Sequence, residues 1–343
     1  MHVRDPNRRP PPPTPEQCAE DAADDRDFQF CAAYVGEHAA GNREGMYGPG
    51  SITWEIWREP ALLIAGVPAV LMQVAHPAIG TGVARLSNFK EDILGRARNT
   101  FTSLYQLVFG DLEEARKASR RLHLVHRRVR GMVEGPGGPL DGSAYRANQQ
   151  ELLRWVGGTV AMFGRDVFER LVRPLSEEEK DRWYTEFLVA SASTGVRPDL
   201  MPARRVDYDA WFAVQLESDV LKIGPPAREI ADALFNSALT RGPADEILAA
   251  GLLPPRWREA YGLRWGAADR AAFQAAMAGL RAWHRLSPGR SRYVVAWHQA
   301  QLRLAHAQGK RGSLQGRLLN ALDRRVDLPT SIQPIAEGVE EPE

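Results

Sequence analysis

Helical periodicity runs through most of this chain and limits its fold more than any other feature. Apolar residues recur at the three- and four-residue spacing of a helix face from about residue 16 to about residue 320, and few segments alternate as a strand would. Alanine, leucine, arginine and glutamate, which favour helices, are common throughout this range. The sequence therefore predicts an all-α fold.

Breaks in the periodicity set the expected domain boundaries. Residues 1–15 include the consecutive prolines Pro10 to Pro13 and predict a disordered or polyproline-like tail. Residues 16–325 are expected to form a single large helical domain, because no internal repeat or long polar linker divides them. Residues 326–343 are expected to be a flexible C-terminal tail.

Two local signals predict helix starts inside this domain. Pro77 suits the first position of a helix, which leaves His76 at the junction between two core helices. Ser176 is expected to be an N-cap, with Glu179 three residues later completing a capping box.

Composition excludes several classes of partner and compartment. Lys and Arg total 44 against 43 Asp and Glu, so the net charge of +1 gives no overall field for nucleic acid or for an anionic membrane. The arginine-rich segment 116–130 is interpreted as a solvated helix face rather than a nucleic-acid site. Only Cys18 and Cys31 are present, and no apolar run is long enough to span a bilayer. Because the N-terminus has no apolar signal region either, we expect a cytoplasmic protein without a transmembrane segment.

The common catalytic motifs are missing from the sequence. It contains no HExxH, no GxxxxGK[ST] and no GxSxG, and no GxGxxG follows a strand-like run. Zincin proteases, nucleotide-binding folds and α/β-hydrolases are therefore unsupported.

Polar side chains interrupt one predicted apolar helix face. Arg96 and Thr100 fall on the same side of a helix as Ile93, Leu104 and Leu107. An arginine and a threonine buried on such a face need polar partners. The pattern predicts either a polar ligand held there or a hydrogen bond between helices.

The next predicted helix carries two histidines, His123 and His126. His126 lies beside an apolar stripe, and His123 lies about 60° further from it on the helix wheel. The stripe consists of Ala115, Ala118, Leu122, Val125 and Val129. A buried imidazole with polar neighbours is what an axial haem ligand requires, although core histidines that bond a carbonyl show the same pattern.

Several segments resemble one family of haem-dependent oxygenases. They are LLIAGVPAVLMQVAHPAIGTGVARLSNFKEDILGRARNTFTSLYQLVFGD, then VHRRVRG, PLDGSAYRANQQELLRWVGGTVAMF and LLPPRWREAYGLRW. In this order and spacing they are similar to the rubber oxygenases (latex clearing proteins) and the MpaB-type oxygenases. The resemblance covers roughly residues 44–310.

The resemblance implies specific roles in a haem pocket between core helices. Its xHxxVxG motif, here VHRRVRG, makes His126 the proximal ligand of the iron of haem b, with His123 in a supporting or partly exposed position. Its RxxxT motif places Arg96 and Thr100 in the wall of the pocket. Rubber oxygenases have a lysine before this threonine that can occupy the sixth coordination site. Asn99 stands there in this chain, so that ligand is not expected.

The function implied is oxygenation of a small hydrophobic substrate, isoprenoid or otherwise unsaturated, with O2. His76 is our candidate for a catalytic base, although packing at a helix junction explains it equally well. One alternative is a non-enzymatic haem protein that senses, stores or carries O2 or haem. Another is a helical binding protein without a cofactor.

Overall fold

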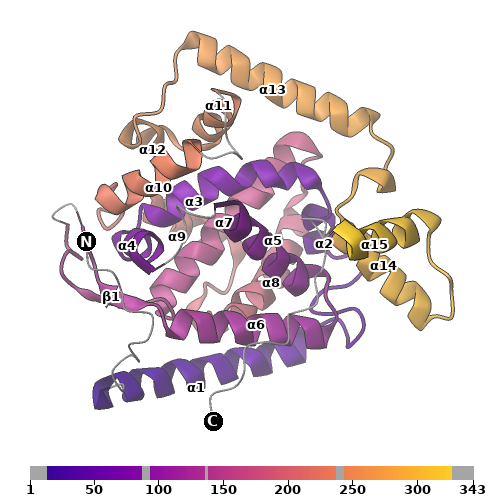
Figure 1. Cartoon of the computed structure of the whole chain (residues 1–343), viewed down its shortest axis with the longest axis horizontal. Coiled ribbons are helices and arrows are strands. Elements are labelled where there is room, and N and C mark those ends of the chain that lie inside the picture. The colour runs from indigo at the N-terminus through magenta and orange to yellow at the C-terminus, as the bar shows by residue number, and fades with distance from the viewer. Residues whose placement is uncertain (1–13, 87–92, 136–137, 237–242, 327–343) are drawn as a thin grey trace.

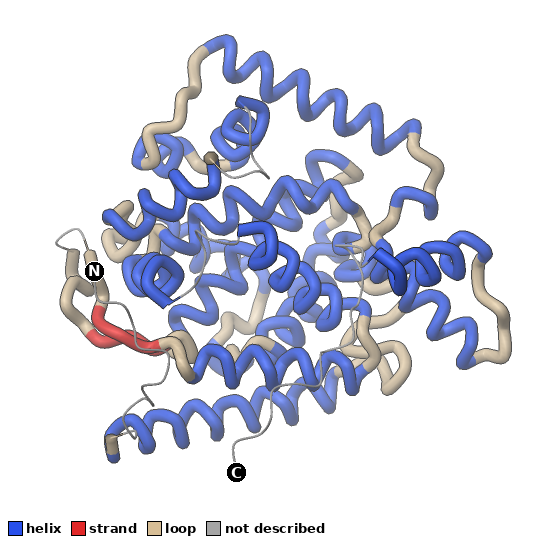
Figure 2. The backbone as a smooth tube through the Cα atoms, viewed as in Figure 1, coloured by secondary structure: helices blue, strands red, loops and turns tan. Residues whose placement is uncertain are grey.

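The computed structural model describes residues 14–86, 93–135, 138–236 and 243–326, and within them the predicted all-α fold is confirmed (Figures 1 and 2). The helices are α1 (Pro15–His38), α2 (Ile52–Trp57), α3 (Gly66–Val74), α4 (Pro77–Leu86), α5 (Ile93–Phe109), α6 (Leu112–Arg127), α7 (Gln150–Leu171), α8 (Glu177–Ser193), α9 (Arg205–Leu216), α10 (Pro225–Phe235), α11 (Pro243–Leu252), α12 (Pro255–Ala260), α13 (Ala267–Leu286), α14 (Val295–Ala307) and α15 (Leu314–Val326). Short 3-10 helices are η1 (Pro60–Ala65), η2 (Pro198–Leu200) and η3 (Arg290–Arg292), and the strands are β1 (Arg130–Met132) and β2 (Ala144–Arg146).

The α7 helix lies at the centre of the molecule and organises its core (Figure 1). It packs against η1, α3, α8 and α13, and ten of its residues are buried. Trp155 of α7 donates its indole N–H to the Met72 carbonyl of α3 at 3.1 Å. Buried apolar residues of α7 belong to two core clusters, so the helix connects these clusters.

The chain bends sharply between α3 and α4, as the proline predicted. The α4 helix begins at Pro77, and the segments Pro60–Val74 and Pro77–Arg85 make an angle of 108°. Within the described ranges, no single helix has the length and apolarity needed to cross a membrane, although this bent pair meets the test when its halves are taken together. His76 thus lies at a corner of the buried core.

The ring of Tyr145 packs against two glycines, one in α4 and one in β1, the strand that follows α6. The antiparallel pair of β1 and β2 places Gly131 opposite Tyr145, whose side chain is buried. A methyl group on Gly131 would lie 3.2 Å from the tyrosine ring, and one on Gly82 of α4 would lie 3.4 Å from it. Both glycines therefore leave space that the Tyr145 ring fills.

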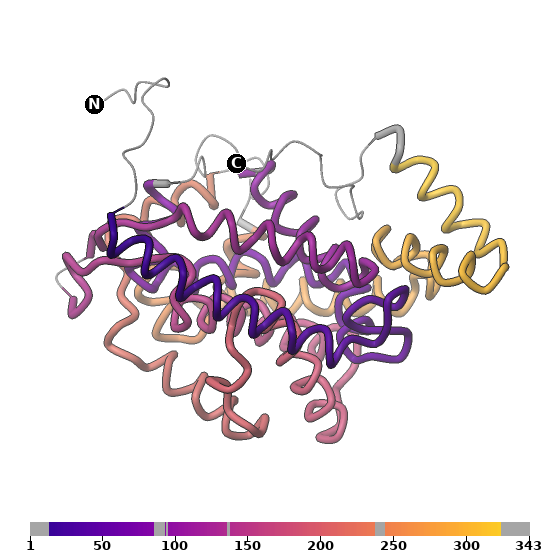
Figure 3. The backbone as a smooth tube through the Cα atoms, turned by 90° about the horizontal axis from the view of Figure 1, so that it is seen from below, coloured from indigo at the N-terminus to yellow at the C-terminus, as the bar shows by residue number. Residues whose placement is uncertain are grey.

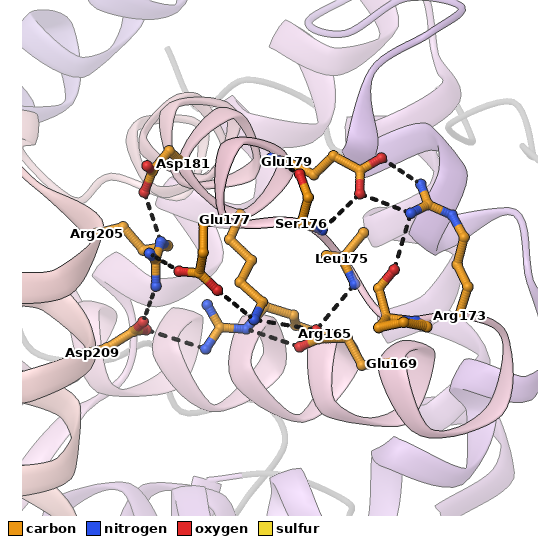
Figure 4. Close-up of polar contacts among 12 residues, drawn as sticks. Arg165, Glu169, Arg173, Leu175, Ser176, Glu177, Glu179, Asp181, Arg205 and Asp209 are labelled. Carbon is orange, nitrogen blue, oxygen red and sulfur yellow. Dashed lines mark hydrogen bonds and ion pairs between the residues drawn. The ribbon is translucent and has the colours of Figure 1, made fainter.

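The predicted capping box at the start of α8 is confirmed. Ser176 Oγ accepts the backbone N–H of Glu179 at 3.2 Å, and the Glu179 carboxylate accepts the N–H of Ser176 at 2.9 Å. The same carboxylate binds Arg173 at 2.8 Å (Figure 4). Nearby, Arg205 of α9 joins three carboxylates, those of Glu177, Asp181 and Asp209. These ion pairs hold the start of α8 between the end of α7 and α9.

Acidic residues attach α1 to the end of α6 and to the small sheet. Asp21 pairs with Arg127 and Arg130, and Asp24 pairs with Arg146 at 3.3 Å. The remaining arginines of segment 116–130 are exposed, namely Arg116, Arg120, Arg121 and Arg128. The interpretation of this segment as a surface helix face is thus correct, with two arginines used to hold α1.

The predicted tails fall mainly on residues that the structure does not describe, 1–13 and 327–343, and they stay predictions. The α1 helix begins at Pro15 with Thr14 as its N-cap.

Candidate functional site

The α5 and α6 helices form an antiparallel hairpin that carries the predicted haem residues. They pack against each other and are joined at Gly110 and Asp111. Arg96 stands 14 residues before Gly110, and His126 stands 15 residues after Asp111. Because both helices rise by the same amount per residue, Arg96 and His126 lie about equally far along their helices from the turn. This end of the hairpin, away from the turn, is called here the open end.

The apolar face of α5 is covered near the turn and uncovered at the open end. Leu107 is 5% exposed, Leu104 is half-buried, and Thr100 on the same face is exposed. Asn99 is exposed as well. The expectation that Thr100 is buried on this face is therefore wrong. The neighbouring helices cover the apolar face of α5 only in its C-terminal half.

Arg96 is half-buried, and burial lowers the pKa of its guanidinium. The group is nonetheless a cation at any physiological pH, because the reference value for arginine lies far above neutrality. A partly desolvated cation gains more from an anionic partner than a fully hydrated one does. Arg96 thus makes the open end favourable for a carboxylate.

The α6 helix directs His126 toward the interior. On the helix wheel His126 lies within about 20° of Ala115, which is 1% exposed, and of Ser119, whose hydroxyl donates to the Ser193 carbonyl of α8. Val125, which we expected in the buried stripe, is 53% exposed. The buried side of α6 is therefore rotated away from Val125 and is centred close to His126.

The environment of His126 keeps its ring neutral. Burial is the main cause that lowers its pKa to about 4, and the neighbouring His123 adds to the effect. Its Nδ1 is buried and, within the described part of the chain, has no hydrogen-bond partner. A histidine must be neutral to bind a metal ion. Above about pH 4, His126 is therefore in the neutral state that an iron ligand needs.

His123 differs from our expectation, because it is more buried than His126. It is 8% exposed, its Nε2 lies 2.8 Å from Asp25 Oδ1, and its ring stacks on Phe28 with centroids 4.4 Å apart. Its carbonyl accepts the side-chain amide of Asn148 at 3.3 Å. His123 therefore helps to hold α1 on α6.

Sequence reasoning missed Asp25 as the partner of His123. The available signal was the acidic run EDAADDRD at residues 20–27, on a helix with almost no apolar face. The acidic side chains of such a helix can pair with cations on a neighbouring helix, and the arginines and histidine of α6 were the available cations.

His76 is buried at the α3–α4 corner. It is 9% exposed, and burial lowers its pKa to about 4, opposed by the charge of Glu151. Its Nδ1 is buried and, among the residues that the structure describes, has no hydrogen-bond partner. His76 is therefore a neutral imidazole with a free nitrogen. These facts are compatible with a proton acceptor and with simple packing alike.

We predict that His76 makes the protein sensitive to acid. The native ring resists protonation down to about pH 4, whereas the unfolded ring takes up its proton near pH 6.5. Its contribution to the free energy of unfolding is thus complete above pH 6.5 and falls between pH 6.5 and pH 4, by about 2–3 kcal/mol. Urea unfolding at pH 7 and pH 4.5 measures this loss.

The matched variant is His76→Gln, which does not titrate. His126 titrates in both proteins, so it contributes equally to both losses. The unfolding free energy of the variant should therefore fall less between the two pH values than that of the wild type. Equal losses in both proteins would show that His76 is not the source of the acid sensitivity.

The open end offers residues suited to haem, but none of them lines either of two small hollows found among the described side chains. One hollow lies beside Val74, Pro77 and Lys222, and the other beside Glu246, Arg264 and Asp269. Within the described residues, no group of three or more His, Cys, Asp or Glu side chains could hold a bare metal ion. The predicted pocket therefore stays a proposal.

Comparison with known proteins identifies the family. The model described as "ER-bound oxygenase mpaB/B'/Rubber oxygenase, catalytic domain" matches residues 54–282, which contain α4, α5, α6 and every candidate site residue. No curated protein and no solved structure matches the chain. Because the match covers well over half of the sequence, the chain belongs to the family of the mpaB/B' oxygenase and rubber oxygenase catalytic domains.

Proposed function

We propose that this protein is a haem b-dependent oxygenase that uses O2 to oxidise a small hydrophobic substrate, in which His126 would hold the iron. The observation that carries the proposal is the state of His126. It is neutral, directed toward the interior and without a hydrogen bond on Nδ1 within the described residues, at the open end of a hairpin in an oxygenase-family domain.

Haem, when bound, would supply the redox chemistry with O2, which amino-acid side chains cannot provide. His126 would hold the iron through its neutral ring. Arg96 would attract the carboxylates of the cofactor, and the Thr100 hydroxyl would give a further polar contact one helical turn closer to Gly110. Asn99 presents only an amide, which is a poor iron ligand.

His123 would act indirectly, by fixing the end of α6 through Asp25. His76 is proposed as the proton acceptor of the reaction, because it is neutral at pH 7 and its Nδ1 has no hydrogen-bond partner among the described residues. The apolar side chains around the α3–α4 corner would favour a hydrophobic substrate over a charged one.

We predict that Arg96→Ala weakens haem binding. Removing one charge-assisted contact costs about 1–3 kcal/mol, which corresponds to a decrease in affinity of roughly 5- to 150-fold. Thr100→Val should have a smaller effect, since Thr100 is exposed. Titration of the purified protein with haemin, followed by absorbance, measures both. The matched control is Arg98→Ala on another side of α5, and an equal loss in that variant would contradict the role given to Arg96.

The experiment that tests the proposed function is oxygen uptake by the haem-loaded protein. With a panel of small isoprenoid and other alkenes, uptake should match the amount of oxygenated product, and His126→Ala should show neither. If the reduced protein binds O2 reversibly and consumes none with any member of the panel, it is a haem protein without oxygenase activity.

A further inference from the structure

The last helix, α15, has its polar side turned toward the protein and its apolar side turned away. It packs on α14, where Gln299 donates its side-chain amide to Asp323 at 3.0 Å and to Asn320 at 3.4 Å. Gly316 is buried in the same contact, against Leu302. An ordinary surface helix buries its apolar side and exposes its polar one. The α15 helix instead places Asn320 and Asp323 in its contact with α14 and leaves a row of leucines exposed.

The outward side of α15 is a stripe of leucines. Leu314, Leu318 and Leu322 are 65%, 62% and 46% exposed, and their spacing of four residues places them on one side of the helix. The helix lies at the edge of the molecule, beside α14 and away from the central α7 (Figures 1 and 3). Three exposed leucines in one row form an apolar surface, unlike single exposed leucines.

The segment that carries this leucine stripe is rich in basic residues. The segment 310–326 contains five basic residues, Lys310, Arg311, Arg317, Arg324 and Arg325, and one acidic residue, Asp323, in a chain whose net charge is only +1. Lys310, Arg311 and Arg317 are exposed. On the helix wheel, Arg317 lies about 60° from Leu314, on the side of the stripe opposite Leu322. The segment is therefore a basic amphipathic helix with its apolar side exposed.

We propose that α15 docks the protein onto an anionic lipid surface. The three leucines would enter the boundary between headgroups and acyl chains, and Arg317 with its basic neighbours would contact lipid phosphates. A second copy of the chain is a poorer occupant, because an antiparallel symmetric pairing through this face would place the Arg317 border of one copy along that of the other. The proposal does not depend on haem, so it can fail or succeed independently of the oxygenase function.

The test is co-sedimentation of the full chain with vesicles of phosphatidylcholine alone and with vesicles containing 30% phosphatidylserine. We expect binding to the anionic vesicles, a decrease of at least tenfold in 0.5 M salt, and weak binding to the neutral ones. The variant Leu314→Ser, Leu318→Ser, Leu322→Ser should lose at least tenfold in affinity. It should stay folded by circular dichroism, because the three side chains are exposed.

The matched control replaces three exposed apolar residues on another surface, Leu200→Ser, Val206→Ser, Val214→Ser, and should bind as the wild type does. Equal binding by the two triple variants would overturn the proposal, as would absence of binding by the wild type. A wild-type dimer that becomes a monomer in the α15 variant, with no vesicle binding, would also overturn it and assign the leucine stripe to self-association.

Discussion

His126→Ala is expected to lose haem, with an affinity more than about 100-fold below that of the wild type. Replacing residues that only support a metal ligand already costs 10- to 100-fold, and the ligand itself should cost more. His126 is directed into the interior at the open end of the α5–α6 hairpin, and its pKa of about 4 keeps it neutral. Titration with haemin, followed by the Soret band, measures the loss.

The control for this prediction is His123→Ala on the same helix. His123 holds α1 through Asp25, so its loss should lower stability while leaving most of the haem affinity, within about tenfold. In His126→Gly, added imidazole should restore the Soret band by taking the place of the missing ring. If His123→Ala lost the haem and His126→Ala kept it, the ligand assignment would be wrong.

Glu59→Ala is expected to cause the largest loss of stability, about 3–5 kcal/mol, because it leaves a buried cation without its partner. The Glu59 side chain is fully buried, and Arg292 of η3 binds both of its oxygens at 3.0 and 3.2 Å. His284 at the end of α13 lies 3.4 Å from the same carboxylate. Glu59 thus connects the start of η1 to the segment that leads into α14.

Urea unfolding measures this loss, with Glu113→Ala as the comparison. Glu113 pairs with Lys117 at 2.8 Å, but both side chains are mainly exposed, so its removal should cost less than about 1 kcal/mol. A loss below 1 kcal/mol in Glu59→Ala would show that the buried pair contributes no more than a surface pair does.

Features governed by neighbours in the sequence were predictable. The break before Pro77 and the capping box of Ser176 and Glu179 depend on local backbone geometry, and both are present. The direction of His126 followed from helical periodicity. The side of α6 that is buried did not follow fully, since Val125 is as apolar as a core residue and is still exposed.

What could not be predicted depends on contacts between distant segments. Asp21 and Asp25 lie about 100 residues before their partners Arg130 and His123, and α1 has no apolar periodicity that would indicate which helix it covers. The exposure of Thr100 could not be predicted for the same reason. Whether a residue of α5 is buried depends on the helices that pack against it, and not on the sequence of α5 alone.

The most direct test of the central claim is the absorbance spectrum of the purified full-length protein during titration with haemin. We predict a Soret band that saturates at one haem per chain. The ferric protein should be high-spin, because Asn99 provides no strong sixth ligand, and it should shift to low-spin when cyanide is added. A protein that shows no Soret band beyond that of free haemin, even after reconstitution, would contradict the account.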